Sequence, residues 1–374
     1  MNKLNIAIIC NSYPTNINQT NQIFIKNISN ALKSEKVNCD VYYNKIYDYW
    51  RDASNYKSII SNIIKYSFFS LTIFKLIKNS RQYDLFNPHG VIMSGFITTI
   101  LGKLMKKKVV LYIHGGDLDI YPKQKDYYKN IYSYTINHCD FIIVNSAYIK
   151  NKVISTFNIS LEKIKIISPG VDQNTFFPKK NISELKSSYK IPSNKIILLF
   201  VGNAIRRKGL DILIDALCHF SAKELKQIFL IACTEGPELK NIKLKINIST
   251  SLSNNIKFID KMLQTKLNEL YNIADVLIFP SREEPLGLVG LESLATGTPV
   301  IGSNIGGIPT FLIDSHNGIL FQSGNSYDLY LKIKELLNNR LILHSLVTNT
   351  KKFSSQYSLH NTAREMKTLF IKLC

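Results

Sequence analysis

The stretch DVLIFPSREEPLGLVGLESLATGTPVIGSNIGGIP, residues 275–309, constrains the fold more than any other part of the sequence. Residues 275–279 are a short apolar run ahead of a proline, which is typical of a buried strand. A polar loop follows, and residues 287–295 then have helix-forming composition. Gly297-Thr298-Pro299 ends that helix before a second apolar run begins at 300–301. The order strand, loop, helix, strand predicts a parallel unit whose loop lies at the carboxyl edge of a sheet, where open α/β sheets bind ligands.

The expected helix N-terminus near Gly287 predicts an anion site. The first N–H groups of a helix have no intrahelical partner, and the helix dipole adds roughly half a positive charge there. Gly287 lets a ligand approach the backbone closely. Glu284 lies just before the helix and Glu292 within it, and carboxylates accept hydrogen bonds from sugar hydroxyls. The pattern predicts a ligand with a sugar on each side of its phosphates, as in a nucleotide sugar. The alternative is that Glu283, Glu284 and Glu292 are solvated surface charges.

The same residues resemble a known family. Glu284-Pro-Leu-Gly-Leu-Val-Gly-Leu-Glu292 resembles the Glu-x7-Glu motif of retaining GT-B glycosyltransferases, specifically glycosyltransferase family 4. Ala295-Thr-Gly-Thr-Pro-Val300 and Gly306-Gly-Ile-Pro309 match the same pattern. The resemblance implies an α/β fold with two Rossmann-like, doubly wound parallel-sheet domains facing across a cleft. It also implies that a sugar is transferred with retention from a nucleotide-diphosphate sugar.

A second group of residues has the form of a phosphate clamp. Arg206, Arg207 and Lys208 lie between glycines after the apolar run 195–201, and guanidinium and ammonium groups bind phosphate oxygens. The segment resembles the family's Gly-Arg…Lys-Gly-x-Asp pattern, in which Lys208 matches the family lysine and Arg207 serves as a second cation. Asn203 stands where the family commonly has an arginine. The alternative is a solvated basic loop.

The first half of the chain carries a candidate sugar contact. The apolar run 108–113 ends at His114-Gly-Gly-Asp117, which resembles the His-Gly-x-Asp strand end of the family's N-terminal domain. The resemblance implies that His114 hydrogen-bonds the transferred sugar near its hydroxymethyl group. A purely structural histidine is the alternative, and His89 is a weaker candidate. The loop 11–21 contains none of the glycines that the family often has there.

The resemblance also gives the expected domains and site residues. A length of 374 residues suits two α/β domains. We expect an N-terminal acceptor-binding domain (1–178), a linker (179–194), a C-terminal donor-binding domain (195–355) and a C-terminal helix (356–374) that crosses back to the first domain. The expected catalytic residues are Glu284, His114 and Lys208, and the expected donor-binding residues are Arg207, Lys208, Glu284, Gly287, Leu288, Val289 and Glu292. We expect no metal or other cofactor, because cations and a helix N-terminus can stabilise the leaving diphosphate.

The charge balance predicts an anionic partner. The net charge is +20, and residues 1–180 hold 24 basic and 11 acidic side chains, a balance of +13. Such an excess suits a phospholipid surface, a phosphorylated substrate or nucleic acid. Nucleic acid is not expected, because the sequence has no zinc finger, RNA-recognition signature or basic–aromatic repeat.

Residues 53–83 contain no acidic residue and alternate apolar side chains with lysines. Lys65 and several Ser and Asn residues argue against a transmembrane helix. We expect one or two helices, partly in the core and partly on a membrane surface, with ordinary core helices as the alternative. At helical spacing one set of apolar residues falls opposite Lys57 and Lys75: Ile59, Tyr66, Phe69, Ile73 and Ile77.

The six cysteines have no metal-ligand spacing, and the sequence begins with an apolar strand rather than a signal peptide. We therefore expect free thiols and a cytoplasmic protein, peripheral on the inner face of the cytoplasmic membrane. The expected acceptor is a saccharide or lipid-linked saccharide in polysaccharide, lipopolysaccharide or other glycan biosynthesis. The alternatives are a nucleotide-sugar epimerase of GT-B fold, a non-catalytic basic membrane-binding scaffold and, ranked lower, a glycosidase.

Overall fold

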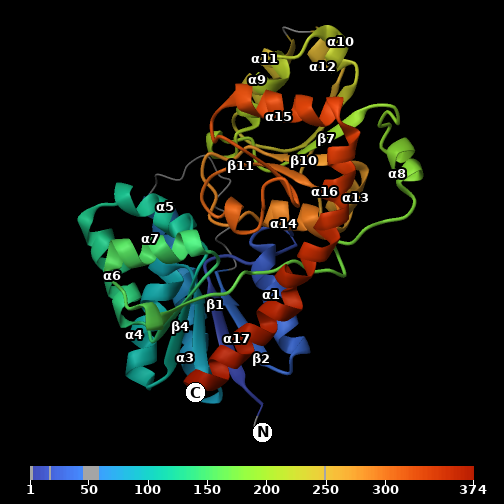
Figure 1. Ribbon diagram of the computed structural model, residues 1–374. Coiled ribbons are helices and arrows are strands. Elements are labelled where there is room, and N and C mark those ends of the chain that lie inside the picture. The colour runs from blue at the N-terminus through green and yellow to red at the C-terminus, as the bar shows by residue number, and fades with distance from the viewer. Residues whose placement is uncertain (1–2, 17, 45–58, 248–249) are drawn as a thin grey trace. The chain divides into compact units, whose positions relative to one another are not determined.

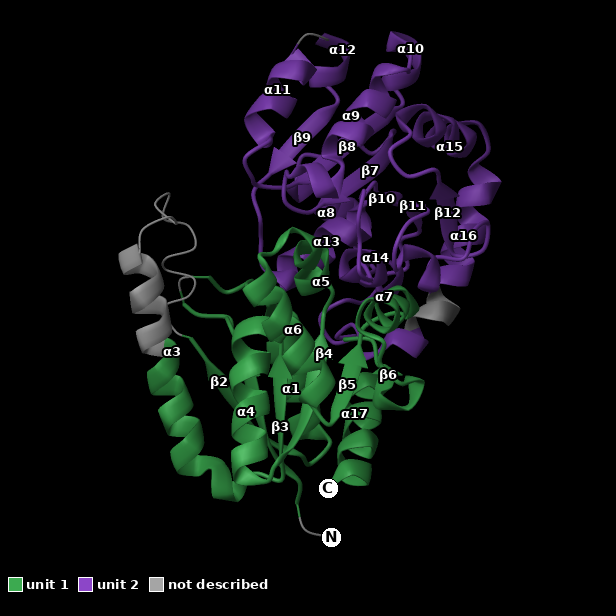
Figure 2. Cartoon of the chain, turned by 90° about the vertical axis from the view of Figure 1, so that its left-hand side faces the viewer, with its two compact units in different colours: residues 1–169, 359–374 green, residues 170–358 purple. Residues whose placement is uncertain are grey.

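Each half of the chain forms a parallel β-sheet with helices on both faces. The computed structural model describes residues 3–16, 18–44, 59–247 and 250–374, without the side chains of 59–68 and 351–354. Contacts divide the chain into unit 1, Met1–Pro169 with Leu359–Cys374, and unit 2, Gly170–Ser358 (Figure 2). Among the described residues each unit has one sheet of six strands. This confirms the predicted fold class of two doubly wound parallel-sheet domains.

The sheet of unit 1 has the strand order β2-β1-β3-β4-β5-β6. Figure 1 labels three of its strands, β1, β2 and β4. Its strands are β1 (Asn5–Cys10), β2 (Asn38–Tyr43), β3 (Leu85–His89), β4 (Lys108–Ile113), β5 (Phe141–Val144) and β6 (Ile164–Ile166). Its main helices are α1 (Ile23–Ser34), α3 (Ile59–Asn79), α4 (Phe96–Met105), α5 (Gly116–Ile120), α6 (Asp126–His138), α7 (Ala147–Phe157) and α17 (Leu359–Leu373). A π-helical turn, Val91–Gly95, comes directly before α4.

Alternation along the strands builds a core on each face of this sheet. Ala7 and Ile9 of β1 belong to the core on one face, and Ile6 and Ile8 to the core on the other, because successive strand residues point to opposite sides. Strands buried on both faces read as continuous apolar runs, which is why the sequence predicted them well. Met366 and other residues of α17 complete the second core beside α1.

The sheet of unit 2 has the strand order β12-β11-β10-β7-β8-β9. Its strands are β7 (Ile196–Val201), β8 (Ile228–Cys233), β9 (Ile256–Ile259), β10 (Val276–Phe279), β11 (Val300–Ser303) and β12 (Gly318–Phe321). Its helices are α8 (Ile182–Ser188), α9 (Leu210–Cys218), α10 (Ala222–Leu225), α11 (Leu239–Asn247), α12 (Thr250–Ser253), α13 (Gln264–Ile273), α14 (Leu288–Ala295), α15 (Ser326–Asn338) and α16 (Arg340–Phe353). Ile196 and Leu198 pack with α9 and α15 on one face, and Ile197 and Leu199 with α13 and α14 on the other.

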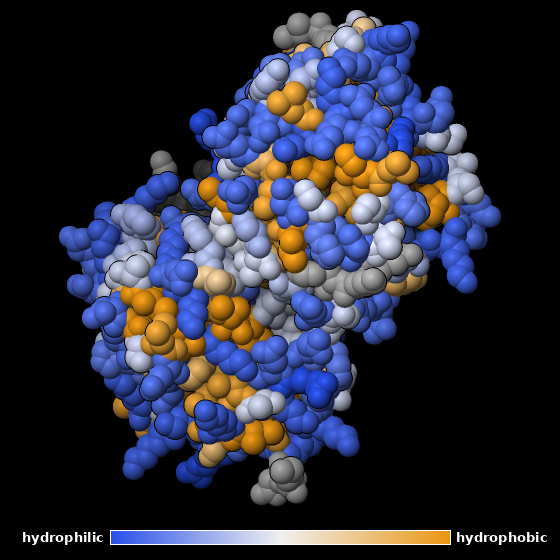
Figure 3. Space-filling view, in the orientation of Figure 1, coloured by the Kyte–Doolittle hydropathy of each residue, from blue (hydrophilic) through white to orange (hydrophobic). Residues whose placement is uncertain are grey.

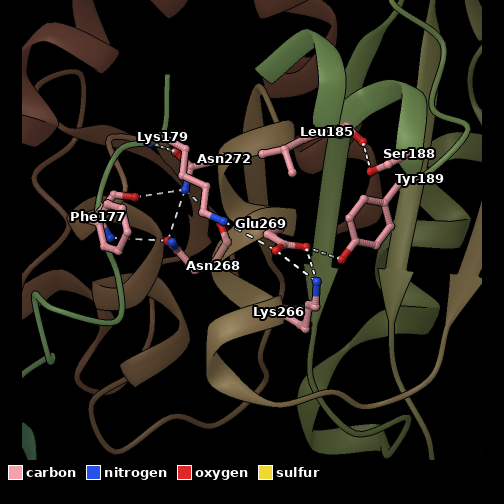
Figure 4. Close-up of polar contacts among 9 residues, drawn as sticks. All are labelled: Phe177, Lys179, Leu185, Ser188, Tyr189, Lys266, Asn268, Glu269 and Asn272. Atoms are coloured by element: carbon pink, nitrogen blue, oxygen red, sulfur yellow. Dashed lines mark hydrogen bonds and ion pairs between the residues drawn. The ribbon is translucent and has the colours of Figure 1, made fainter. Parts of the chain in front are cut away.

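The segment expected as a linker, 179–194, contains helix α8 and is bound to unit 2. Figure 4 shows its polar contacts with α13. The Tyr189 hydroxyl donates to Glu269 over 2.7 Å, and Lys179 Nζ lies 3.4 Å from the same carboxylate. The backbone N–H of Lys179 donates to the side chain of Asn272. The contacts therefore place this segment in unit 2, and the chain passes between the units at 169–170 and again at 358–359.

Helix α3 is partly in the core and partly exposed. Phe69 and Leu76 are buried, and Ile73 packs against the same core. Leu71 and Phe74 are exposed on another side of the helix. Of the expected apolar stripe, Phe69 and Ile73 thus lie in the core, whereas Ile77 is exposed. Lys57, and the side chains of Ile59, Lys65 and Tyr66, lie outside the described residues.

The surface is mainly hydrophilic on the face drawn in Figure 3, with hydrophobic residues in smaller patches on both units. None of the described helices is long and apolar enough to cross a membrane. Four of the six cysteines are buried, Cys218 and Cys374 are exposed, and none of the six forms a disulfide bond.

We expect Glu269→Gln to destabilise unit 2 by about 1–2 kcal/mol at neutral pH, because its partly buried carboxylate accepts from a tyrosine and two lysines. Burial alone would raise the pKa of Glu269, but these partners outweigh it and hold the pKa below its ordinary value. A depressed carboxyl pKa contributes stability above pH 4.5 that is lost as the pH falls through the folded value. The midpoint of thermal unfolding of Glu269→Gln should therefore lie below that of wild type at pH 7.5. The difference should be smaller at pH 4.0.

The matched control is Glu335→Gln, which changes an exposed glutamate of α15. Its midpoint should follow that of the wild type at both pH values. An equal loss in the two variants would contradict a specific role for Glu269.

Candidate functional site in unit 2

The strand order of the unit 2 sheet reverses between β7 and β10. From β7 the sheet extends through β8 to β9 on one side, and through β10 to β12 on the other. The two strands pair in parallel, with Val276 opposite Leu198. The loops that follow them therefore leave the same edge side by side, and such a switch point is where doubly wound sheets bind ligands. The candidate site is built from these two loops.

An ion pair joins the two loops. Lys208 Nζ lies 2.6 Å from Glu284 Oε2, and both side chains are largely buried. The hydroxyl of Ser281 donates to the same carboxylate oxygen over 3.3 Å, and the Lys208 ammonium lies 5.7 Å from the centre of the Phe279 ring. Removing one partner of such a pair leaves an uncompensated buried charge. The pair therefore fixes Lys208 and Glu284 at the edge of the sheet.

A second set of contacts braces the basic loop. Arg282 donates two hydrogen bonds to the carboxylate of Asp211, over 2.8 and 2.7 Å, and a third to the carbonyl of Arg206. Burial alone would raise the pKa of Asp211, but the bidentate Arg282 guanidinium outweighs it and lowers that pKa. Arg207 donates to the carbonyl of Glu283 over 3.1 Å. Arg282 and Arg207 thus hold the loop backbones in place through the carbonyls of Arg206 and Glu283.

Glycines let the loops approach closely. A Cβ atom on Gly209 would lie 1.9 Å from the carbonyl oxygen of Pro280, so only glycine allows the contact between the two loops. Gly287, at the N-terminus of α14, has φ +106°, and a Cβ atom there would lie 2.7 Å from the Phe279 ring. The first backbone bond of this helix runs from Gly290 N–H to the Gly287 carbonyl. The N–H groups of Leu288 and Val289 precede that bond and so have no partner within the helix.

Glu292 is a buried carboxylate held by α13. The hydroxyl of Tyr271 donates to Glu292 Oε2 over 2.9 Å, and the amide of Gln264 lies 3.5 Å from Oε1. Burial raises the pKa of Glu292 to about 7, although both hydrogen bonds act in the opposite direction. Gln264 and Tyr271 are seven residues apart on one face of α13, while Glu269 and Asn272, which bind the connecting segment, lie on another.

Unit 1 brings a different set of residues to its own sheet edge. His89 ends β3, and His114 follows β4; their ring nitrogens Nδ1 and Nε2 lie 2.9 Å apart. Asn145 donates to the carbonyl of His114, and Asp117 accepts from the N–H of Val91. Burial raises the pKa of Asp117 and lowers that of His114 well below its ordinary value. The two histidines are therefore uncharged at neutral pH, in contrast to the ion pairs at the edge of unit 2.

The structure brings most of the predicted donor residues together in unit 2. The group comprises Arg207, Lys208, Glu284, Gly287, Leu288 and Val289. Glu292 belongs to the same helix as Leu288 and Val289, with its side chain directed to α13. His114 lies in unit 1. Because Glu284 and Glu292 are buried and only Glu283 is exposed, the alternative of solvated surface charges fails for both motif glutamates.

Sequence reasoning missed four residues that position this site. Asp211 is the aspartate of the Lys-Gly-x-Asp pattern, but no role is predicted for it; for the others the only signal in the sequence is a polar side chain within an otherwise apolar run, or a charge beside the motif. They are Tyr271, Gln264, Asp211 and Arg282.

Comparison with known proteins agrees with this architecture. The profile of glycosyl transferases group 1 matches residues 181–353, and that of glycosyltransferase family 4 matches residues 22–175. An uncharacterized glycosyltransferase of Methanocaldococcus jannaschii is 28% identical over 338 residues, which is 87% of this chain and 88% of the relative.

Two solved structures have a similar fold. Sucrose-phosphate synthase from Thermosynechococcus elongatus has a TM-score of 0.82 at 19% identity, over 99% of both chains. HepE of Anabaena, determined with UDP-glucose, has a TM-score of 0.76 at 17% identity, over 99% of this chain and 100% of that one. The chain belongs to the group 1, family 4 glycosyltransferases, and is a nucleotide-sugar-dependent glycosyltransferase of GT-B-like fold in a family that retains configuration. The family predicted from the motif is confirmed.

We expect Glu292→Gln to change the pH dependence of stability. Because the pKa of Glu292 rises from its ordinary value of 4.5 to about 7 on folding, the folded state keeps a proton that the unfolded state loses in this window. The folded state is thus destabilised as the pH rises from 4.5 to 7, by up to about 3 kcal/mol. The variant lacks this loss, so its unfolding midpoint relative to wild type should rise across the window. Parallel pH profiles for the two proteins would contradict the raised pKa.

Proposed function

We propose that this glycosyltransferase binds its donor diphosphate at the β7–β10 edge of unit 2 and transfers the sugar to a saccharide or lipid-linked acceptor at an anionic membrane face. The observation that carries the donor site is the Lys208–Glu284 ion pair beside the N-terminus of α14. A cation and free helix N–H groups suit a diphosphate, and the neighbouring carboxylate suits the hydroxyls of the sugar.

Each donor-site residue then has a distinct role. Arg207, Lys208 and the amides at Gly287–Val289 hold the diphosphate, which shares Lys208 with Glu284. Glu284 accepts hydrogen bonds from the transferred sugar, and Glu292 accepts them from the ribose. His114 contacts the transferred sugar near its hydroxymethyl group. A buried hydroxyl, that of Thr234 at the end of β8, has no partner among the described residues and suits the border of the base site.

The transfer step needs stabilisation of the leaving group more than a protein base. The acceptor oxygen forms a bond to the anomeric carbon on the face from which the diphosphate oxygen departs. The acceptor proton passes to a phosphate oxygen, and the bond to the diphosphate breaks. Lys208, Arg207 and the helix N–H groups stabilise the negative charge that develops on the diphosphate. Glu284 orients the sugar and forms no covalent bond to it.

Each alternative class of protein would leave part of the proposed site without a function. A glycosidase would use two carboxylates and leave the cations without a function. A nucleotide-sugar epimerase would bind the same donor and need no acceptor, so transfer to an acceptor separates it from the proposed enzyme. A basic membrane scaffold would need neither glutamate, and Glu284→Gln would leave its binding unchanged.

A thermal-shift screen tests the donor site. UDP, GDP, ADP and their common sugar conjugates are tested at pH 8, with UDP-glucose first because HepE was determined with it. We expect one nucleoside diphosphate to raise the midpoint, since a ligand at a hundredfold excess over its Kd stabilises by ~2.7 kcal/mol. Lys208→Ala and Glu292→Gln should lose the shift, and the effect in wild type should weaken below pH 7 as Glu292 is protonated.

The matched control is Lys223→Ala, an exposed lysine of α10 before β8, at the amino edge of the same sheet. It should keep the full shift. No shift with any nucleotide, or an equal loss in Lys208→Ala and Lys223→Ala, would contradict the proposed donor site.

The exposed face of α3 supports the membrane part of the proposal. Leu71, Phe74, Lys75 and Lys78 follow the i, i+3, i+4, i+7 spacing of one helix face, and Leu71 and Phe74 are 58% and 67% exposed. Apolar side chains flanked by lysines suit the surface of a bilayer with anionic lipids.

Vesicle flotation tests this surface. We expect wild type to float with vesicles that contain anionic phospholipid, less with neutral ones, and less as salt is raised. The double variant Leu71→Ser/Phe74→Ser should lose flotation, while Leu341→Ser, which changes a 79% exposed leucine of α16, should not. Equal flotation with neutral and anionic vesicles would contradict the proposal.

A further inference from the structure

Two histidines of unit 1 share a hydrogen bond at the carboxyl edge of its sheet. His89 Nδ1 and His114 Nε2 are 2.9 Å apart, the two rings are within 27° of coplanar, and their centres are 5.0 Å apart. Stacked rings keep their atoms about 3.5 Å apart or more. The nitrogens are therefore joined edge to edge, and one of them carries the proton that the other accepts.

Asn87 decides which nitrogen of His89 carries its proton. The Asn87 side-chain N–H donates to the carbonyl of Val110 over 2.6 Å, which fixes the orientation of the amide. Its other end, Oδ1, then faces His89 Nε2 at 3.1 Å. An amide oxygen only accepts, so His89 Nε2 must carry a hydrogen. The carbonyl of Val110 thus sets the tautomer of His89 by fixing the amide of Asn87.

The same reasoning passes to the second histidine. His89 is buried and burial lowers its pKa to about 3, so the ring is neutral and its Nδ1 holds a lone pair. His114 Nε2 must therefore donate to it. Burial and the neighbouring ring lower the pKa of His114 as well, so its remaining nitrogen, Nδ1, is an acceptor. Among the described residues no protein group is hydrogen-bonded to that nitrogen.

We infer that Asn87 and His89 are positioning residues that hold His114 as the Nε2–H tautomer and so present Nδ1 as an acceptor for a substrate hydroxyl. Tyr112 and Phe24 pack against the His114 ring, with centres 4.2 and 4.6 Å away, and Asn145 binds its carbonyl, so the ring is also fixed in orientation.

The inference gives the site a chemical preference and rests on the proposed contact of His114 with the sugar. An acceptor nitrogen pairs with a hydroxyl group. It repels a fluorine, a methoxy oxygen or a carboxylate at the same position, because these groups only accept. The site therefore favours a sugar that carries a free hydroxyl there over its uronic acid or deoxyfluoro counterpart.

Nitrogen NMR of the full-length protein labelled with 15N-histidine tests the tautomer without any ligand. We expect the His114 signals, identified by their loss in His114→Gln, to report a protonated Nε2 and an unprotonated Nδ1 at pH 7.5. In His89→Phe, which keeps an aromatic ring of similar size, we expect both His114 tautomers to be populated. A protonated Nδ1 in the wild type would overturn the inference, as would an unchanged His114 tautomer in His89→Phe.

Turnover with a matched donor pair tests the consequence. With the nucleotide sugar found by the thermal screen, replacing the hydroxyl at the hydroxymethyl position by fluorine should slow wild type roughly tenfold, as expected for one lost hydrogen bond. The difference should shrink in His89→Phe. Equal turnover of the two donors by wild type would overturn the acceptor role. Failure of every nucleotide sugar to bind would instead contradict the proposed function, while the NMR result would still decide the tautomer.

Discussion

The parallel pairing of β7 with β10 is the constraint on which the proposed donor site depends. Strands that are neighbours at a switch point send their following loops from the same edge, and here those loops carry Lys208 and Glu284. Each residue is 76 positions from its partner in the sequence, and the sheet alone brings them within 2.6 Å. The buried ion pair would be costly if either charge were alone. A diphosphate that binds there therefore meets a cation whose position is already fixed.

Helix α13 makes two sets of contacts, one with Glu292 and one with the segment that connects the units. One face presents Tyr271 and Gln264 to Glu292, and another binds the segment that connects the units through Glu269 and Asn272. Helical periodicity makes this division possible, because residues seven apart share a face and their neighbours point elsewhere. Glu292 is buried without a cation, which explains its raised pKa and the energetic cost of its charged form. Ribose hydroxyls would supply donors that reduce this cost.

The two sheet edges differ in electrostatic character. The edge of unit 2 is charged, with the Lys208–Glu284 pair and the Arg282–Asp211 pair near the helix N-terminus. The edge of unit 1 is built from neutral histidines and an asparagine that are linked by directional hydrogen bonds. Charge suits a diphosphate, which is recognised from several directions, whereas a sugar hydroxyl requires a donor or acceptor at a defined atom. This difference is why we propose that unit 2 binds the diphosphate and that unit 1 contacts a sugar hydroxyl.

The sequence by itself determined the strands, the fold class and the family. Strands buried on both faces are continuous apolar runs, and the string from Glu284 to Pro309 carries its loop and helix signals locally. Only the tertiary structure decided which polar groups meet: Tyr271 with Glu292, Arg282 with Asp211, and Asn87 with His89. It also showed that the segment expected as a linker folds as α8 against unit 2. These contacts depend on which strands and helix faces are neighbours, and residues far apart in the chain carry no local signal of that proximity.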